Sequence, residues 1–427
     1  MTEERPALNQ NTNFHKLWAG QSISLVGINV TYVALPLLAI YAIDAGAFEV
    51  GLITLAETVP YLLVTLWAGA WIDGRRRIPV MLFADLSRGA ILVAVAVLTL
   101  LGMVNLEIIV GLMLFYGVGS VLFEVAYYAV VPSIVRRSDL MRANSRLQTS
   151  GSFALLAGTN IGGVLTQVVT APFALIVDAF TFVASAVSLR WMRVQETIQP
   201  ATPGESRRRQ IWEGLRYVAR QPVLRSLTLS SALYNFFTTG VMTLFPVFAV
   251  RTLELNAATI GFVQSFGAIG AALGALLATR MIAALGAGSS YIWAKGLAWA
   301  SVLSLGLIPA HSPVTVAALV VAFSVSGMLI VSNVVGITLR QAVTNDQMLG
   351  RMTATYKFIS YGAQSLGGFG AGLAGELFGL RAAMVGGGIL LITTVLVALV
   401  PAVRTVRELP TEVPDEPTPT PAAAATK

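Results

Sequence analysis

Residues 36–51 read PLLAIYAIDAGAFEVG, and residues 246–261 read PVFAVRTLELNAATIG. At a shift of 210 residues the two segments match in their first proline, in their acidic residue (Asp44 and Glu254), in their last glycine and in the register of their apolar residues. Each segment joins the end of one apolar run to the start of the next. A whole arrangement of helices therefore occurs twice in the chain.

The duplication continues farther along the chain at a shift of 209. Four more pairs match there: Leu140 with Leu349, Arg142 with Arg351, Gly158 with Gly367, and Gly163 with Gly372. Two halves of the same orientation form a parallel repeat about an axis along the membrane normal. The repeat predicts a cavity between the halves.

The composition requires a bilayer as solvent. Of 427 residues, 56% are hydrophobic and 11% are charged, whereas a soluble domain has about 25% charged residues. Runs without any Asp, Glu, Lys or Arg cover 17–43, 147–177, 226–250, 255–279, 296–339 and 382–403. Each run is long enough for at least one crossing of about 20 residues. We expect an all-α integral membrane protein.

Breaks at proline-containing segments divide the apolar sequence into twelve expected helices. These lie near 16–43, 48–73, 78–102, 106–134, 142–169, 172–194, 223–250, 257–284, 289–309, 313–340, 350–377 and 381–403. Arginines gather in alternate connections, at Arg75–Arg77, Arg136–Arg146 and Arg190–Arg225, and only Arg251 and Arg381 fall on the other side. This positive-inside asymmetry predicts that both chain ends are cytoplasmic.

The expected organisation has five parts: a cytoplasmic tail (1–15), a six-helix bundle (16–194), a linker (195–222), a second six-helix bundle (223–404) and a disordered tail (405–427). Within the linker, residues 206–220 have an amphipathic pattern, with Trp212, Leu215 and Val218 on one face. That pattern suits either a helix at the headgroup layer or a solvated linker helix. The apolar run after the N-terminal tail has no cleavage-site pattern, so we expect a retained helix.

Several classes of protein are excluded by residue content. The chain has no cysteine and only two histidines, so thiolate chemistry and an imidazole metal site are ruled out. It also lacks a GxxxxGK[ST] loop. We expect no enzymatic activity, no metal and no cofactor. The net charge of +7 follows membrane topology, and we expect no nucleic-acid partner.

Two motifs carry a resemblance to the major facilitator superfamily. Gly69-Ala-Trp-Ile-Asp73-Gly-Arg75-Arg-Arg77 resembles its first cytoplasmic gate loop, with Gly74 and Arg76 departing from the usual order. Gly158-Thr-Asn-Ile-Gly162-Gly163 resembles the exporter-associated GPxxGG motif, with threonine at the proline position. LWAGQSISLVG (17–27), DLSR (85–88), DAFTF (178–182) and EGLRYVARQPVLR (213–225) are similar to a bacterial subgroup that includes macrolide efflux proteins and the enterobactin exporter. The resemblance implies proton-driven export.

Three acids in expected membrane helices are candidates for proton coupling: Glu57, Glu124 and Asp178. A charge in the bilayer costs at least about 2.5 kcal/mol, so each acid needs a partner or a purpose. Glu57 is expected near the midplane and could alternate between protonated and ionised states, or could bond to a neighbouring helix. Glu124 could face its repeat mate Asn333 across the cavity or contact the gate loop. For Asp178 a structural hydrogen bond is the favoured interpretation.

Six polar residues are candidates for the wall of the substrate cavity: Asn29, Tyr32, Tyr234, Asn235, Ser326 and Asn333. An apolar wall with few polar anchors suits a bulky amphiphilic ligand, although the same residues could bond between helices. Small-residue faces occur at Gly151, Gly158, Gly162 and Gly163, and at Gly367, Gly368, Gly370, Gly372 and Gly375. These faces could seal or flex the junction between the halves, or only permit tight packing.

The sequence thus predicts a monomeric proton antiporter of a bacterial inner membrane that exports a small amphiphilic molecule, such as an antibiotic or a siderophore. A lipid flippase of the same fold and a non-transporting receptor or scaffold are the alternatives.

Overall fold

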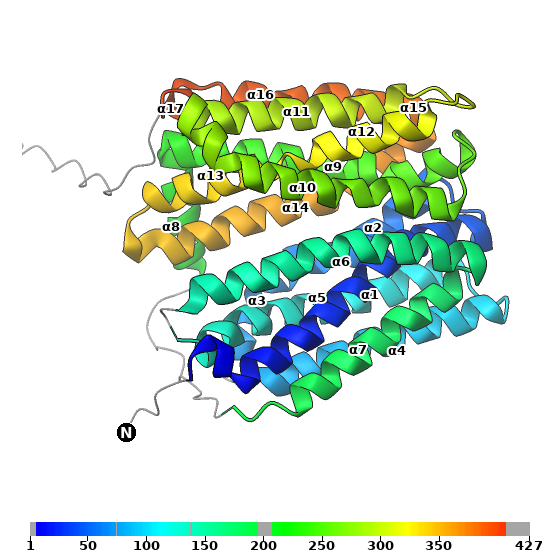
Figure 1. Ribbon diagram of the computed structural model, residues 1–427, viewed down its shortest axis with the longest axis horizontal. Coiled ribbons are helices and arrows are strands. Elements are labelled where there is room, and N and C mark those ends of the chain that lie inside the picture. Colours follow the sequence, from blue (N-terminus) through cyan, green and yellow to red (C-terminus); the bar gives the residue numbers. More distant parts are fainter. Residues whose placement is uncertain (1–5, 74, 137–138, 195–206, 407–427) are drawn as a thin grey trace, which may run out of the picture.

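The computed structural model describes residues 6–73, 75–136, 139–194 and 207–406, and these form helices and short turns without any strand (Figure 1). Residues 1–5, 195–206 and 407–427, which belong to the expected tails and linker, lie outside the described residues. The first half contains η1 (Leu8–Gln10), α1 (Thr12–Ile43), α2 (Ala47–Leu63), α3 (Thr65–Asp73), α4 (Arg77–Leu100), α5 (Leu106–Ile134), α6 (Leu140–Val168) and α7 (Ala171–Arg190).

The second half follows α8 (Arg207–Arg220). It contains α9 (Pro222–Arg251), α10 (Ala257–Leu285), α11 (Ala287–Leu307), α12 (Thr315–Gly327), α13 (Ile330–Ala342), α14 (Asp346–Phe378), α15 (Leu380–Leu390), α16 (Ile392–Ala398) and α17 (Pro401–Arg404). Within the described ranges, eight segments are long and apolar enough to cross a membrane: α1, α4, α5, α7, α9, α10, α12 with α13, and α15 with α16. Large apolar side chains such as Phe115, Phe180 and Leu276 are about two-thirds exposed or more, as expected for surfaces that face lipid.

Some expected helix boundaries are wrong. The chain becomes helical at Thr12 rather than residue 16, because Asn11 caps α1: its Oδ1 accepts from the Phe14 amide at 2.9 Å, and its Nδ2 donates to the Ile134 carbonyl at 2.7 Å. Capping by asparagine satisfies amides that would otherwise be orphaned. The expected helix 313–340 is divided at 328–329, where hydrogen bonds of the i→i+3 type tighten the turn.

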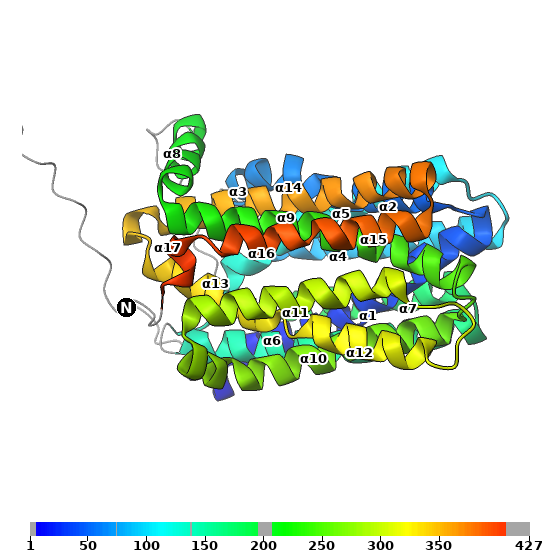
Figure 2. The ribbon, with the colours of Figure 1, turned by 90° about the horizontal axis from the view of Figure 1, so that it is seen from above.

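The two halves form two bundles that meet along two pairs of helices. In Figure 1 the first bundle lies below the second, and Figure 2 shows the same pairing from above. Helix α2 packs along α14, and α6 packs along α10. We call the end with the turns at Asp44 and Glu254 the acidic end, and the opposite end, with Arg75–Arg77, the basic end.

The internal repeat is visible in the backbone of the turns at the acidic end. Six described residues there adopt positive φ, and they form three repeat pairs: Asp44 and Glu254 (52° and 54°, shift 210), Gly102 and His311 (67° and 56°, shift 209), and Thr170 and Gly379 (90° and 85°, shift 209). Four of the six carry a side chain, for which this conformation is uncommon. Equivalent turns therefore keep the same conformation even where the residue type differs.

Equivalent glycines make both crossings between the halves. A methyl group added at Gly51 of α2 would lie 2.9 Å from the Cα of Gly372 in α14, and one added at Gly261 of α10 would lie 2.9 Å from the Cα of Gly163 in α6. The shifts 51→261 and 163→372 are 210 and 209. Close backbone approach through small residues is the usual way for membrane helices to associate.

Buried apolar residues join the halves at only one end. One cluster includes Val30–Ile40 and Val50 of the first half together with Leu244–Ala249 and Ile260 of the second. Toward the basic end the described buried residues form separate clusters, one within the first bundle and others within the second. The halves are thus sealed against each other at the acidic end, and the residues described at the basic end form no apolar core common to both halves.

Helix α8 lies at the basic end, where it packs against α14. Gly214 lies against the α14 backbone at Arg351, and the Glu213 carboxylate pairs with the Arg351 guanidinium. Val218 is buried with Leu224 and Met352, whereas Trp212 remains two-thirds exposed. The linker helix is therefore tied to the second bundle by an ion pair and by a small apolar cluster.

Candidate functional site

Two adjacent cavities lie where the halves meet, and Glu57, Thr58 and Gln364 line both of them. The large cavity has a volume of about 290 Å³ and is lined from α1, α2, α5, α9, α10 and α14. Its wall is made by Ile28, Thr31, Tyr32, Leu35, Pro36, Val50, Ile53, Thr54, Glu57, Thr58, Tyr116, Thr238, Thr239, Met242, Thr243, Pro246, Gln264 and Gln364. The small cavity, of about 220 Å³, is lined by Glu57, Thr58, Tyr61, Ser120, Glu124, Tyr361, Gln364 and Ser365.

Helical periodicity brings Glu57 to this position. Thr54, Glu57, Thr58 and Tyr61 follow one face of α2 at spacings of three and four residues, which is the spacing of neighbours on a helix surface. Helix α5 crosses α2 closely at this level, since a methyl group at Gly117 would lie 3.0 Å from the carbonyl carbon of Glu57. The crossing leaves the polar face of α2 directed toward the cavities.

Glu124 lies in the same small cavity as Glu57. It accepts a hydrogen bond from the Tyr361 hydroxyl at 3.4 Å, and the Tyr361 ring lies 5.4 Å from the Tyr61 ring, centroid to centroid. One turn farther along α5 toward the basic end, the Lys357 ammonium lies 4.2 Å from the centroid of the Tyr128 ring. Two carboxyl groups, from α2 and α5, therefore share one polar cavity whose opposite wall is α14.

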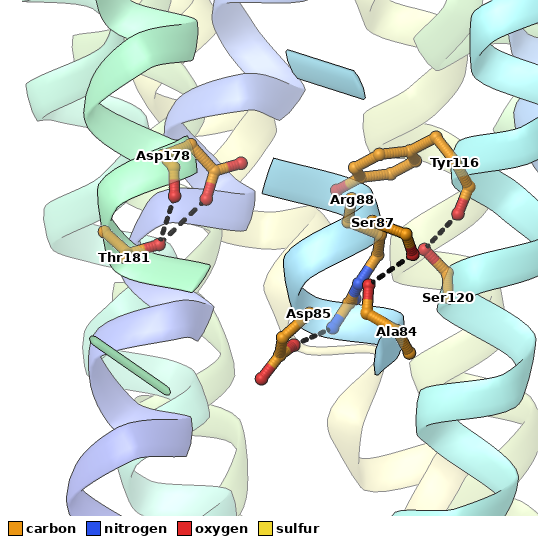
Figure 3. A network of polar contacts seen from close by, with 8 residues as sticks. All are labelled: Ala84, Asp85, Ser87, Arg88, Tyr116, Ser120, Asp178 and Thr181. Atoms are coloured by element: carbon orange, nitrogen blue, oxygen red, sulfur yellow. Dashed lines mark hydrogen bonds and ion pairs between the residues drawn. The ribbon is translucent and has the colours of Figure 1, made fainter. Parts of the chain in front are cut away.

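Asp178 is placed differently, inside the first bundle. It is fully buried and accepts hydrogen bonds from Thr31 Oγ1 at 2.6 Å and from Thr181 Oγ1 at 2.9 Å. Figure 3 shows its contact with Thr181. Figure 3 also shows Asp85 paired with Arg88. Asp85 Oδ1 lies 2.5 Å from Arg88 Nη2. The Arg88 guanidinium also lies between the Phe123 and Phe182 rings. The two threonines satisfy the Asp178 carboxylate, which fits its structural interpretation, although Thr31 also lines the large cavity.

Of the six residues expected in the cavity wall, the structure places Tyr32 there. The Asn29 amide donates to the Leu25 carbonyl of its own helix, and the Ser326 hydroxyl donates to the Phe323 carbonyl. Tyr234 is buried beneath the Lys295 ammonium, 4.2 Å from the ring centroid, and Asn235 reaches the Ser360 carbonyl at 3.4 Å. These four residues, like the exposed Asn333, do not line the two cavities, and Glu124 meets Tyr361 rather than Asn333.

The expected gate loop lies at the basic end. The Arg75 guanidinium is stacked 4.2 Å from the Trp71 ring centroid, and Arg77 Nη1 donates to the Ala129 carbonyl of α5 at 3.1 Å. Gly69 and Asp73 belong to α3, but the side chain of Asp73 and the surroundings of Gly69 lie outside the described features. The described arginines thus contact α3 and α5 of their own bundle.

Some glycines of the two small-residue faces contact helices of their own bundle, and others contact helices of the opposite bundle. Gly158 and Gly162 lie against the α1 backbone and Gly367 against the α9 backbone, all within their own bundles, whereas Gly163 and Gly372 make the crossings between halves. Three other glycines of these faces have separate surroundings: Gly368 and Gly375 lie against Thr54 and Ala47 of α2, and Gly370 against the Phe236 ring. Around Gly151 no atom lies within 4 Å of an added methyl group. The exporter-like motif in α6 therefore serves both contacts.

Sequence reasoning missed the polar groups that complete the cavities. Tyr61, Tyr116, Tyr361, Gln264 and Gln364 were not expected there, yet all five line one or the other cavity. A signal existed in the sequence, because Tyr61 follows Glu57 by four residues and Gln364 follows Tyr361 by three. In the described part of the chain no three His, Cys, Asp or Glu side chains are grouped so as to hold a metal ion.

Comparisons with known proteins agree with this architecture. A family model described as transmembrane secretion effector matches residues 6–426. The multidrug efflux pump Tap of Mycolicibacterium fortuitum is 27% identical over 377 residues, covering 83% of this chain and 87% of that protein. The enterobactin exporter EntS of Escherichia coli is 25% identical over 414 residues, covering 95% and 96%. Among solved structures, the nucleoside transporter NupG aligns with a TM-score of 0.76 at 10% identity, covering 91% of this chain and 99% of that chain.

Proposed function

The chain belongs to the transmembrane secretion effector family, a branch of the major facilitator superfamily of transporters, and from that premise we propose that it is a proton-coupled exporter of small amphiphilic molecules. It works as a monomer in a bacterial inner membrane. Relatives named for multidrug efflux and for enterobactin export support the direction of transport and the two substrate classes to be tested, drugs and siderophores.

The proposed topology has twelve crossings with both chain ends in the cytoplasm. Four further crossings are added to the eight apolar segments. One is formed by α2 together with α3, and the other three are α6, α11 and α14. Each bundle, 16–194 and 223–404, then contains six crossings, and the basic end faces the cytoplasm as the positive-inside rule requires. Reporter tags at both termini should be accessible from the cytoplasm only.

The proposed cycle is alternating access. The halves are sealed by a shared apolar cluster at the acidic end, and among the described residues no such cluster joins them at the basic end. That arrangement suits the state that takes up substrate from the cytoplasm. Rocking of the halves would then separate the shared cluster and the two glycine crossings, open the acidic end and release the substrate outside.

One observation carries the coupling assignment: Glu57 and Glu124 line one cavity at the junction of the halves. A carboxyl group there can bind a proton when the acidic end opens and can release it when the basic end opens, because each state connects it to water on a different side. Asp178 is a weaker candidate, since its carboxylate already accepts two hydrogen bonds.

The test uses protein reconstituted in liposomes with an imposed pH gradient. The substrates are first identified in cells: an efflux-deficient host that expresses the protein is exposed to a panel of drugs and siderophores, with and without an uncoupler. We expect gradient-driven transport that the substitution Glu57→Gln abolishes, because the amide cannot release a proton. Glu107→Gln, on the exposed first turn of α5, is the matched control. A Glu57→Gln protein with full gradient-driven export would contradict the coupling assignment. Movement of labelled lipid alone would favour a flippase.

A further inference from the structure

We propose that the substrate is held through a positively charged group, with Glu57 as its anchoring carboxylate and the tyrosines of the cavity wall around it. The exported class would then be organic cations. The proposal rests on the proposed export function and adds to it the charge of the cargo.

The charges in the cavity wall have one sign. Two acidic residues, Glu57 and Glu124, line the two cavities, and their described walls include no Lys, Arg or His. The remaining lining side chains are uncharged hydroxyls, amides and apolar groups. A site of this kind attracts a cation and repels an anion of the same size.

Glu57 differs from the other acids inside the bundles in having no partner. Asp85 pairs with Arg88, Asp178 accepts from two threonines, and Glu124 accepts from Tyr361. Within the part of the chain that the structure describes, the Glu57 carboxylate makes no ion pair and no hydrogen bond. An acid at membrane depth without a partner marks a functional site whose counter-charge comes from elsewhere. A cationic ligand supplies that counter-charge when the carboxyl group is ionised.

Aromatic rings surround the same position. Tyr32 and Tyr116 line the large cavity, and Tyr61 and Tyr361 line the small one. Ring faces attract cations, and cages of rings recognise quaternary ammonium groups.

This chain already places its own buried and half-buried cations over ring faces. The Arg88, Lys295, Arg340 and Lys357 side chains lie 4.6, 4.2, 3.6 and 4.2 Å from the ring centroids of Phe123, Tyr234, Tyr356 and Tyr128. Among the described contacts, no cation lies over the four tyrosines of the cavity wall. No described cation of the chain therefore competes with a ligand for these rings, of which Tyr61 packs against Tyr361 and Tyr116 against Phe182.

Two cations that lie near the wall, Arg88 and Lys357, do not reverse this charge balance. Arg88 is neutralised by Asp85, and Lys357 lies over Tyr128 rather than in the lining of either cavity. A catecholate or carboxylate substrate would meet two acids with no basic side chain in the wall. Tighter binding of an anion than of a cation of equal shape would therefore contradict the proposal.

The test compares two probes of equal shape and opposite charge, tetraphenylphosphonium and tetraphenylborate, on the purified full-length protein in detergent. Equilibrium binding should favour tetraphenylphosphonium by about 30-fold or more, because a desolvated charge pair loses at least that much when one partner is removed. Glu57→Gln should weaken tetraphenylphosphonium binding by a similar factor and leave tetraphenylborate binding unchanged or tighter. Glu57→Asp, which keeps the charge, should retain the preference, and Glu107→Gln should behave as the wild type.

Three results would overturn the proposal: equal or tighter binding of tetraphenylborate by the wild type, no binding of either probe, or a preference for tetraphenylphosphonium that Glu57→Gln does not reduce. The wild-type comparison needs no variant to fold, and size-exclusion profiles check the variants. Transport in liposomes separates the two proposals. If the protein prefers the anion but still exports with the gradient, the proposed cation site is refuted and the proposed export function is not. If the protein binds the cation as expected but exports nothing, the proposed export function is refuted instead.

Discussion

The two glycine crossings allow a quantitative test of how the halves are joined. At Gly163 an added methyl group would lie 2.6 Å from the Ala257 carbonyl oxygen and 3.0 Å from the Cα of Gly261. At Gly372 the corresponding distances are 2.7 Å to the Ala47 carbonyl oxygen and 2.9 Å to the Cα of Gly51. These neighbours are backbone atoms, so the helices themselves must separate to admit the methyl group.

The expected magnitudes follow from two opposing effects. Overpacking costs about 1–3 kcal/mol, and replacing glycine by alanine within a helix gains about 0.5–1 kcal/mol. Gly163→Ala and Gly372→Ala should therefore each destabilise the protein by about 0–2.5 kcal/mol. Gly151→Ala on the same helix as Gly163 should be stabilising, because no atom lies within 4 Å of the added methyl group.

The measurement is thermal unfolding of the purified protein in detergent, followed through its seven tryptophans, together with transport in liposomes. The two crossing variants should behave alike because they occupy equivalent positions of the repeat. Loss of transport with stability retained would indicate that the crossings flex during the cycle, whereas loss of both would indicate tight packing alone. Equal shifts for Gly163→Ala and Gly151→Ala would refute the close approach of α6 and α10.

Three further predictions concern ion pairs and buried acids. Arg251 Nη2 lies 2.6 Å from Asp44 Oδ1 at the exposed acidic end, so Arg251→Gln should cost less than about 1 kcal/mol. Salt should shrink that difference in melting experiments; equal differences at low and high salt would contradict an ion-pair effect. Asp85→Asn leaves the buried Arg88 without its partner and should cost about 3–5 kcal/mol. Adding Arg88→Gln should recover part of the yield of folded protein, and a double variant no better than the single one would argue against the pair. Asp178→Asn should retain gradient-driven transport with a modest loss of stability, and a folded variant without proton dependence would transfer the coupling role to Asp178.

Much of the architecture was readable from the chain because its signals are local or periodic. The repeat of Pro36–Gly51 at Pro246–Gly261 depends on residue spacing alone, and the turns at Asp44 and Glu254 then adopt the same left-handed conformation. The expected start of the first helix at residue 16 was wrong, because Asn11 caps the helix through the Phe14 amide; the Asn11 side chain is also held by the Ile134 carbonyl, more than one hundred residues away.

The site was only partly predictable. Glu57 and Glu124 stand out in any hydropathy reading, since a charge in an apolar run is conspicuous. Their common cavity, however, depends on the crossing of α2 and α5 at Gly117, and the Tyr361 hydroxyl reaches Glu124 from the opposite half. Asn29, Ser326 and Tyr234 are equally polar in sequence, yet their side chains are engaged within their own bundle.

The sequence by itself determined that the chain is a duplicated helical membrane protein, because bilayer solvation and helix periodicity act on each segment independently. Only the tertiary structure decided which polar groups face one another. The rotation of each helix about its axis is set by contacts with neighbours distant in sequence. Those contacts bring Thr31 to Asp178 and, among the described residues, leave Glu57 without a partner.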